Sequence, residues 1–468
     1  MDPSTTKRYL PWVVATALFM QQLDSTIVNT TIPAMAASLA VTPLSLKAVV
    51  TSYILSLAVF IPVSGWLAER FGTRRIFLFA LALFTVSSLL CGLAINATML
   101  IAARVPQGIA ASMMMPVGRM AIVRTFPKGE LLRAMNFVIM PALLGPLLGP
   151  TVGGLIVHWL TWRDIFFINL PFGLVAWWFA HRHMPDYRSD ARHPFDWRGL
   201  LLFGSGAALL SWLLEVFGEH QLSTTQVVLT LLVSLLLLAA YGWHAMGKPF
   251  ALLRLSLFHT RTFRVSVLGG FVTRLGLGGM PFLLPLLYQL GLGLPAWQSG
   301  LLMMPAAAAA MGMKLISTYL LRHFGYRKVL VVNTVLIAGA ISAYARVDTG
   351  TPMAVIVVMG LLLGLFNSLQ YSSMNSMAYA DISEADTAQA STIASTLQQI
   401  SFSFGLACGS LVTGFYLAGL PQTDPLAVTG ALHHAFLTLA GLTVLSSLSF
   451  WTLHASDGES VSKGVIPE

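Results

Sequence analysis

Apolar runs of about twenty residues recur along almost the whole chain, and they limit its fold more than any other feature. A helix of about twenty apolar residues crosses the roughly 30 Å hydrocarbon core of a bilayer. Each run should be a helix, because an isolated strand leaves its backbone groups unpaired in lipid. The sequence predicts fourteen spans, at 10–32, 46–66, 76–95, 99–121, 134–158, 164–181, 199–217, 224–246, 264–290, 297–321, 328–346, 352–377, 388–417 and 431–454.

The composition also indicates a membrane protein with many spans. Of the 468 residues, 56% are hydrophobic and only 10% are charged, whereas soluble domains contain about 25% charged residues. The first run is too long for the core of a signal peptide and lacks a small-residue cleavage site, so we expect a retained helix. The expected fold class is therefore an all-α polytopic membrane protein.

The sequence contains no motif that indicates a known class of enzyme. Cys91 and Cys408 lie far apart in apolar spans, which argues against a disulfide framework or a metal site. The segment GWHAMGK, 242–248, has the spacing of a phosphate-binding loop, but Pro249 replaces the hydroxyl residue that would hold magnesium. HExxH and GxSxG motifs do not occur. We expect no enzymatic activity, no cofactor and no metal.

The placement of lysine and arginine predicts the orientation. With the N-terminus inside, the inner segments hold 20 basic residues, and the outer loops hold three, Lys47, Arg163 and Arg346. Such a bias marks the cytoplasmic side, although the acidic loop DISEAD, 381–386, is a local exception. We expect both termini in the cytoplasm and the spans in a bacterial inner membrane. The net charge of +9 then reflects orientation rather than binding of nucleic acid.

A short repeat suggests two related halves. ERFGTRR, 69–75, follows the second span, and RHFGYRK, 322–328, follows the tenth. A chance match of two basic turns is the alternative, but the matching order of spans favours duplication. We expect six-helix halves at 1–182 and 260–468, separated by a linker and an inserted helix pair at 183–259. Paired halves are a frequent transporter plan, with the substrate site between them near mid-membrane.

Asp24 is the strongest functional candidate, because it is a carboxylate inside the first span. It lies about 21 Å along the helix from Leu10 at 1.5 Å per residue. Gln21, Ser25 and Asn29 share a broad face with it. A charge at a helix centre costs about 2.5–3.5 kcal/mol, so such residues are usually functional. Asp24 could bind and release a proton; a structural acid permanently paired with a base is the alternative.

Arg104 in the fourth span is the expected partner of Asp24. Counted from the outer ends of their helices, the depths of the two residues differ by roughly 5 Å, which an arginine side chain can reach. A neighbouring guanidinium stabilises the ionised carboxylate, so movement of Arg104 could tune proton release. A structural arginine bonded to helix carbonyls is the alternative.

Two further groups of residues complete the candidate set. GPLLGPTVGG, 145–154, places glycines four residues apart, which permits close helix packing, and its two prolines remove helix hydrogen bonds. Arg274, Asn367 and Gln370 lie in the ninth and twelfth spans. With Gln21, Ser25 and Asn29 they are the expected residues of a substrate cavity. A structural ion pair for Arg274 and interhelical hydrogen bonds for the amides stay open.

Six segments together resemble the major facilitator superfamily, specifically its fourteen-span drug:proton antiporter branch. They are LDSTIVNTTIP at 23–33, GWLAERFGTRR at 65–75, ARVPQG at 103–108, GPLLGPTVGG at 145–154, WRDIFFINLPFG at 162–173 and FDWRG at 195–199. Three residues depart from the branch pattern: Glu69 stands for an aspartate, Pro106 interrupts the fourth-span motif, and Asp164 replaces an aromatic or apolar residue. Pro106 puts the geometry of Asp24 and Arg104 in doubt.

The resemblance implies two six-helix halves with two inserted helices and fourteen transmembrane helices. It implies that the loop motif helps to close the cytoplasmic side, and that the fifth-span motif seals the halves and favours exchange over leak. The implied gating residues are Gly65, Glu69, Arg70, Gly72, Arg74 and Arg75 in the loop motif, and Gly145, Pro146, Gly149, Pro150, Gly153 and Gly154 in the fifth-span motif.

The expected function is proton-coupled export of small amphipathic compounds by alternating access. Asp24 and Arg104 would couple the proton, and a monomer would suffice. The expected partners are protons, a small-molecule substrate and the lipid bilayer, without nucleic acid. Proton-coupled uptake of a metabolite is a second transport hypothesis. A membrane sensor that transports nothing is the third, and the small soluble portion of the chain disfavours it.

Overall fold

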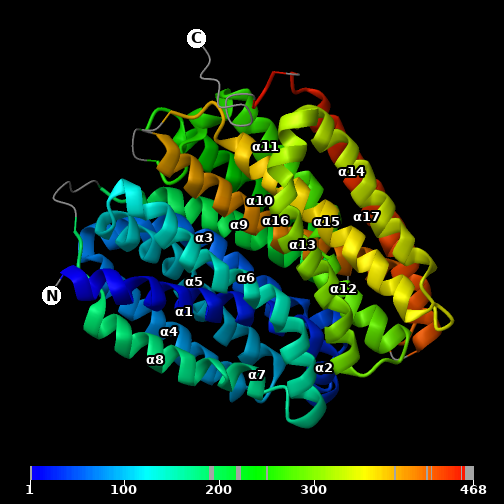
Figure 1. Cartoon of the computed structure of the whole chain (residues 1–468). Coiled ribbons are helices and arrows are strands. Elements are labelled where there is room, and N and C mark those ends of the chain that lie inside the picture. Colours follow the sequence, from blue (N-terminus) through cyan, green and yellow to red (C-terminus); the bar gives the residue numbers. More distant parts are fainter. Residues whose placement is uncertain are drawn as a thin grey trace. The chain divides into compact units, whose positions relative to one another are not determined.

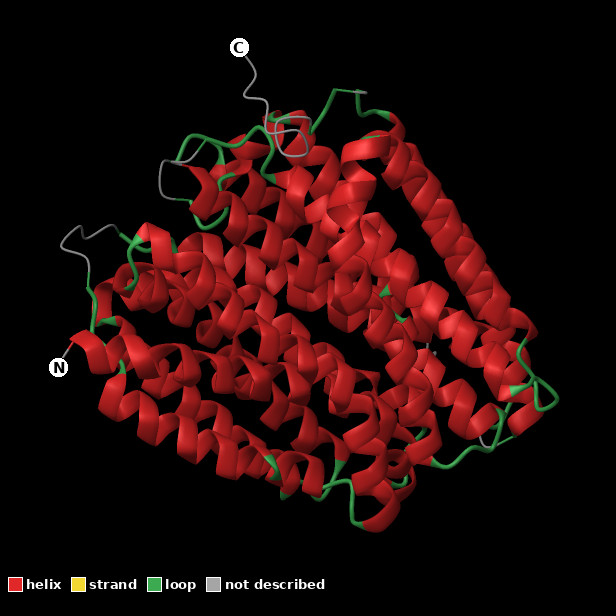
Figure 2. Ribbon diagram, in the orientation of Figure 1, coloured by secondary structure: helices red, strands yellow, loops and turns green. Residues whose placement is uncertain are grey.

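A computed structural model describes residues 3–188, 194–217, 223–248, 251–383, 386–417, 420–422, 424–454 and 456–458. Over these residues the chain is helical and forms no strand (Figure 2). The long helices of the first half are α1 Pro3–Ile27, α3 Lys47–Phe71, α4 Thr73–Gly92, α5 Ala97–Thr125, α6 Lys128–Trp159 and α8 Asn169–His183, with short helices α2 Ile32–Leu39 and α7 Asp164–Phe167. The later helices are α9 Trp197–Phe217, α10 Thr224–Ala245, α11 Arg261–Leu277, α12 Met280–Leu286, α13 Ala296–Phe324, α14 Tyr326–Ala343, α15 Met353–Ala378, α16 Thr387–Leu417 and α17 Pro425–Trp451.

Thirteen helical segments in the described chain are long and apolar enough to cross a membrane. They coincide with the second to fourteenth predicted spans, and α1 supplies the remaining one. Its end that carries Gln21, Gln22 and Asp24 is more polar than the other spans. The chain is thus a multi-pass membrane protein, and the expected all-α class is confirmed.

The first span is not the continuous helix that the sequence predicted at 10–32. Helix α1 ends at Ile27, a short 3₁₀ turn follows at Asn29–Thr31, and α2 begins at Ile32. Pro33 at the start of α2 explains the break, since proline suits the first turn of a helix and cannot continue one. Asn29 therefore does not continue the helix face that carries Asp24.

The first compact unit comprises residues 1–197 together with 295–300. Within it, α1 packs against α6 and α8, and α5 packs against α3 and α4 (Figure 1). Buried side chains such as Val14, Phe77, Phe84 and Met114 fill its core. Small residues on α1, α5 and α6 let these helices approach closely, as membrane helices generally require.

The second compact unit comprises residues 198–294 and 301–468. Within it, α11 packs against α15, α16 and α17, and α14 packs against α15 and α17. Leu330, Met374, Met377 and Phe450 belong to its buried core. Helix α10 is different, because only 11% of its most apolar stretch is buried. An apolar helix this exposed suits contact with lipid.

The two copies of the repeated motif adopt the same local structure. Gly72 joins α3 to α4 with φ +100°, and Gly325 joins α13 to α14 with φ +77°. Only glycine adopts such angles without strain. In each copy the glycine therefore ends one helix and starts the next at once, which keeps the two basic residues at the start of the second helix.

Candidate functional site

Asp24 lies in a closed cage of hydrogen-bond donors. Its side chain and that of Arg104 are both 0% exposed. Arg104 Nη1 donates to Asp24 Oδ2 at 2.6 Å. Gln107 Nε2 and Asn169 Nδ2 donate to the other oxygen, Oδ1, at 3.0 and 2.7 Å. The cage thus joins α1, α5 and α8.

The same contacts fix the position of Arg104. Its Nε donates to the carbonyl of Val49 at 3.1 Å, and its Nη1 also donates to Gln107 Oε1 at 2.8 Å. The guanidinium carbon lies 4.2 Å from the centre of the Tyr53 ring, an arrangement that attracts a cation to an aromatic face. Helix α5 continues through Pro106. The doubt that this proline raised about Asp24 and Arg104 does not apply.

Glycine brings α3 close enough to α5 to build this side of the cage. A Cβ atom at Gly108 would lie 2.1 Å from Ser56 Oγ and 2.3 Å from the carbonyl oxygen of Tyr53. Any side chain at position 108 would therefore push α3 away. The Tyr53 ring and the Val49 carbonyl would then move away from Arg104.

The arrangement stabilises an ionised carboxylate. Asp24 accepts three hydrogen bonds, one of them from a cation, which offsets its loss of water. A proton on Asp24 would remove the negative charge and leave Arg104 buried without a counter-ion. An uncompensated buried charge is strongly unfavourable. Loss of the negative charge of Asp24 would therefore destabilise the closed cage.

Helix α6 supports α1 from another side through its glycines. A Cβ at Gly145 would lie 2.8 Å from the Leu23 nitrogen, one at Gly149 would lie 2.1 Å from Thr26 Oγ1, and one at Gly153 would lie 2.5 Å from the Ile27 carbonyl oxygen. The stripe thus lies against the turns of α1 on either side of Asp24.

The prolines of the same motif lie within a continuous helix α6. Thr30 Oγ1 donates to the Pro150 carbonyl at 3.0 Å, and Thr26 Oγ1 donates to the Gly145 carbonyl at 3.3 Å. Gly154 faces the backbone of Ala296, within the short segment that the first unit includes. Pro146 is half-buried in the same helix.

The loop motif after α3 lies against the segment that follows α8. Thr73 N donates to the Tyr187 carbonyl, and Thr73 Oγ1 donates to the Pro185 carbonyl, both at 3.0 Å. The Asp186 carboxylate accepts from Arg74 N at 3.3 Å and occupies the space beside Gly72. The Arg74 guanidinium donates to the His181 carbonyl. We call residues 184–188 the latch segment.

The other predicted residues of the loop motif have looser surroundings. Arg70 is exposed and lies 5.4 Å from the Trp66 ring, Arg75 is exposed, and Glu69 is half-buried. Gly65 lies in α3, and no atom of the described residues lies within 4 Å of the position that a Cβ would take there.

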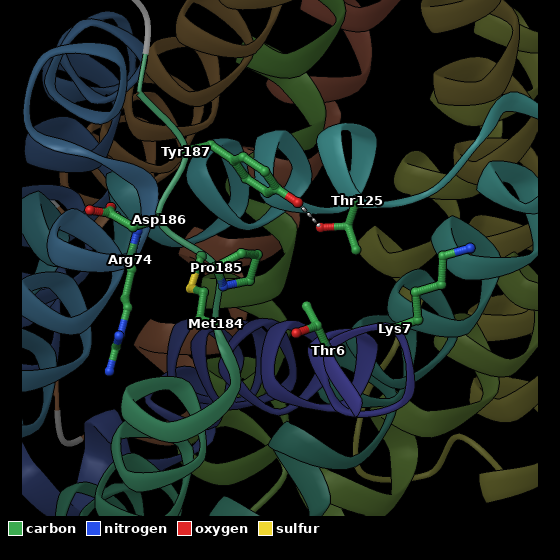
Figure 3. Close-up of a pocket in the computed structure, with 8 residues that line it drawn as sticks. All are labelled: Thr6, Lys7, Arg74, Thr125, Met184, Pro185, Asp186 and Tyr187. Atoms are coloured by element: carbon green, nitrogen blue, oxygen red, sulfur yellow. Dashed lines mark hydrogen bonds between the residues drawn. The ribbon is translucent and has the colours of Figure 1, made fainter. Parts of the chain in front are cut away.

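A pocket of about 430 Å³ opens beside the latch segment (Figure 3). Tyr187 reaches across it, and its hydroxyl lies 3.1 Å from Thr125 Oγ1. Lys7 at its edge is paired with Glu130 at 2.9 Å. The residues that line it are Thr6, Lys7, Arg74, Thr125, Met184, Pro185, Asp186 and Tyr187. It does not include Asp24 or its donors.

The polar neighbours of Asp24 along α1 do not join its cage. Ser25 Oγ donates to the Gln22 carbonyl at 2.9 Å within the helix. Gln21 Oε1 and Asn29 Oδ1 are buried and have no hydrogen-bond partner among the described residues. These two buried amide oxygens can therefore each still accept a hydrogen bond.

The predicted residues of the second unit lie at two places. Gln370 is fully buried, where it accepts from Asn333 at 2.8 Å and donates to Thr334 at 2.9 Å, which ties α15 to α14. Asn367 is half-buried, and its Oδ1 has no partner among the described residues. Arg274 on α11 is 4% exposed and lies 4.9 Å from the Tyr371 ring.

Two donors of the cage were not predicted from the sequence. Gln107 follows Arg104 by three residues, so the two share a helix face, and this spacing was the available signal. Asn169 comes from a helix far along the chain, where it also donates to Ser88 Oγ at 3.0 Å. A single asparagine two residues before Pro171 gives no sign of that partner. Among the described residues, no three His, Cys, Asp or Glu side chains are grouped to bind a metal.

Comparison with known proteins assigns the family. Residues 14–406 match the Major Facilitator Superfamily. The MdtD protein of Serratia proteamaculans (strain 568) is 37% identical over 94% of this chain and 92% of its own length. The MdtD protein of Enterobacter sp. (strain 638) is 38% identical over 94% and 93%. Both names refer to multidrug resistance.

Comparison with solved structures agrees with this family at the level of the fold. A crystal structure of a D-xylose-proton symporter superposes with a TM-score of 0.69 at 14% identity, over 96% of this chain and 98% of that one. At this identity the likeness concerns the fold alone. Together with the family match and the relatives, it leads to one conclusion: the chain belongs to the Major Facilitator Superfamily.

Proposed function

We propose that the protein is a proton-coupled antiporter that exports small amphipathic compounds by alternating access. The Asp24 cage carries the proposal, because it holds an ionisable group in the membrane between a cation and two amide donors. The likeness to proteins named for multidrug resistance supports export and a small-molecule substrate. The protein would act as a monomer in a bacterial inner membrane, with both termini in the cytoplasm.

The proton step follows from the electrostatics of the cage. In the closed cage the Asp24 carboxylate is the counter-ion of the Arg104 guanidinium. A proton that enters from outside would neutralise Asp24, weaken its three hydrogen bonds and free Arg104 to find another partner. Helices α1, α5 and α8 would then lose a common anchor. A group that alternates between these two states can couple proton entry to a change of conformation.

The available driving force suffices without ATP. One elementary charge that crosses the membrane gains about 2.3 kcal/mol per 100 mV. One proton gains about 1.4 kcal/mol more for each unit of pH difference. For an uncharged compound exchanged for one proton, these contributions amount to about 3.7 kcal/mol at 100 mV and one pH unit, which sustains a gradient of roughly 500-fold.

The remaining predicted residues receive roles in the same cycle. The glycines and prolines of α6 would hold α1 and limit leak, as their close contacts with that helix suggest. The loop motif and the latch segment would close the cytoplasmic end. Gln21, Ser25, Asn29, Asn367 and Gln370 would line or support the substrate path. The moving halves would be 1–182 and 260–468, with 183–259 as an inserted part.

Substrate flux in two directions tests the proposal. Cells that overproduce the protein and cells that lack it are screened for differences in growth inhibition by a panel of toxic compounds. Compounds that differ are then added to inside-out vesicles with an imposed pH gradient. Export predicts accumulation inside these vesicles that collapses with the gradient. Movement in the opposite direction would instead support proton-coupled uptake, and no protein-dependent movement would support a sensor.

A further inference from the structure

Arg274 is a buried cation that forms no ion pair with a described residue of its own unit. Its side chain is 4% exposed, and it takes part in none of the ion pairs between described residues. It follows Arg261, at the start of α11, by thirteen residues. This spacing places it about 20 Å along the helix at 1.5 Å per residue. Lipid headgroups do not reach such a depth.

The helices that pack against α11 carry no acid. Helices α11 to α17 contain no aspartate or glutamate. The acids of this part of the chain lie in the connections between helices or in the tail, as do Asp348 and Asp457. In the first unit, the deeply buried Asp24 is already engaged by Arg104. A charge inside the membrane is expensive unless it is paired, and it usually serves function.

The immediate surroundings of Arg274 are aromatic. The guanidinium carbon lies 4.9 Å from the Tyr371 ring and 5.6 Å from the Phe402 ring, and both rings are half-buried. Gly270, one turn earlier, leaves room for the guanidinium itself, because a Cβ there would lie 2.8 Å from Arg274 Nη1. The Nε atom is buried without a hydrogen-bond partner among the described residues.

We propose that Arg274 binds the anionic group of the exported compound, which we infer to be an amphipathic organic anion such as an aromatic carboxylate. The guanidinium offers donors in a planar fork that matches a carboxylate. Tyr371 and Phe402 offer aromatic faces to the apolar body of the same molecule. This inference rests on the proposed export function and adds the charge of the substrate to it.

The charge of the substrate has an electrical consequence. Exchange of a monovalent cation for one proton moves no net charge. Exchange of a monovalent anion for one inbound proton moves two elementary charges inward in each cycle. An inside-negative potential therefore accelerates export of the anion much more than export of the cation.

Three compounds with one aromatic body test the inference: 2-naphthylacetate, its methyl ester and 2-naphthylmethyl-trimethylammonium. The full chain is reconstituted in proteoliposomes, and compound movement is followed against an imposed pH gradient, with and without a potassium diffusion potential. We expect protein-dependent exchange of the carboxylate, accelerated by the potential. We expect Arg274→Gln to reduce it at least about tenfold, the loss of one strong charged contact, and Arg274→Lys to retain part of it.

Lys314→Gln is the control, because it removes an exposed cation from α13 in the same unit; it should exchange the carboxylate at the wild-type rate. The potential dependence needs only the wild type, so a poorly folded Arg274→Gln variant does not prevent a result. Equal exchange of all three compounds, or exchange of the carboxylate that is unchanged in folded Arg274→Gln, would overturn the role of Arg274 while leaving export intact. A folded wild type that exchanges none of the three would contradict the export function itself.

Discussion

Replacing Asn169 by alanine should destabilise the closed cage around Asp24. Asn169 Nδ2 donates to Asp24 Oδ1 at 2.7 Å, in a site with no solvent exposure. The alanine variant lacks this donor, and no water reaches the buried oxygen to replace it. Arg104 and Gln107 keep their own contacts with the carboxylate in this variant.

The size of the effect follows from the kind of bond that is lost. A hydrogen bond to a charged group contributes about 1.5–3 kcal/mol. Loss of the bond therefore predicts a fall of about 1.5–3 kcal/mol in the free energy of unfolding. Relaxation of the remaining donors toward Asp24 would bring this loss toward the lower value.

Thermal unfolding of the purified protein in detergent provides the assay. Ser88→Ala is the matched control, because Ser88 accepts from Asn169 at 3.0 Å but forms no hydrogen bond with Asp24 in the described part of the chain. We expect this control to lower the melting temperature by less than half as much as Asn169→Ala. An Asn169→Ala protein with the wild-type melting temperature would refute the view that this donor holds the cage together.

Three further predictions concern packing around the same helices. Gly145→Ala should displace α1, because a Cβ there would lie 2.8 Å from the α1 backbone. Overpacking should lower the free energy of unfolding by about 1–3 kcal/mol. A lower melting temperature and slower exchange would show this. Gly72→Ala should lower the melting temperature more than Gly325→Ala, since both have positive φ but only Gly72 faces Asp186; equal shifts would mean that backbone strain alone matters. Tyr53→Phe should keep the exchange rate within about twofold of wild type, because the ring attracts Arg104 while the hydroxyl has no described partner. Tyr53→Ala should slow exchange strongly. Equal effects of the two variants would count against the ring contact.

The helical spans could be predicted because the membrane imposes a local rule on each of them. Every span must be apolar and about twenty residues long, and both properties can be counted in one stretch of sequence. The break after Ile27 was missed, because the apolar residues Val28 and Ile32 flank the short polar turn Asn29–Thr31 and extend the run across it. The proline at position 33 was the local signal for that break.

The site was only partly predictable, for a different reason. Asp24 and Arg104 stand out because charges are rare inside apolar spans. Gln107 and Asn169 are neutral amides, which are ordinary in membrane helices, and only the packing of α1, α5 and α8 turns them toward one carboxylate. Asp186 likewise resembles any linker acid until the chain folds back beside Gly72.

Substrate-driven proton movement in Asp24→Asn tests the central claim most directly. Inside-out vesicles that contain wild type, Asp24→Asn or Asp348→Asn are given a pH gradient and a compound found in the toxicity screen. Asp348 lies in an exposed connection between α14 and α15, so its variant controls for the loss of any carboxylate. The account predicts exchange in wild type and Asp348→Asn and none in Asp24→Asn, which should still bind the compound. Proton exchange that persists in folded Asp24→Asn would contradict the account and show that another group carries the proton.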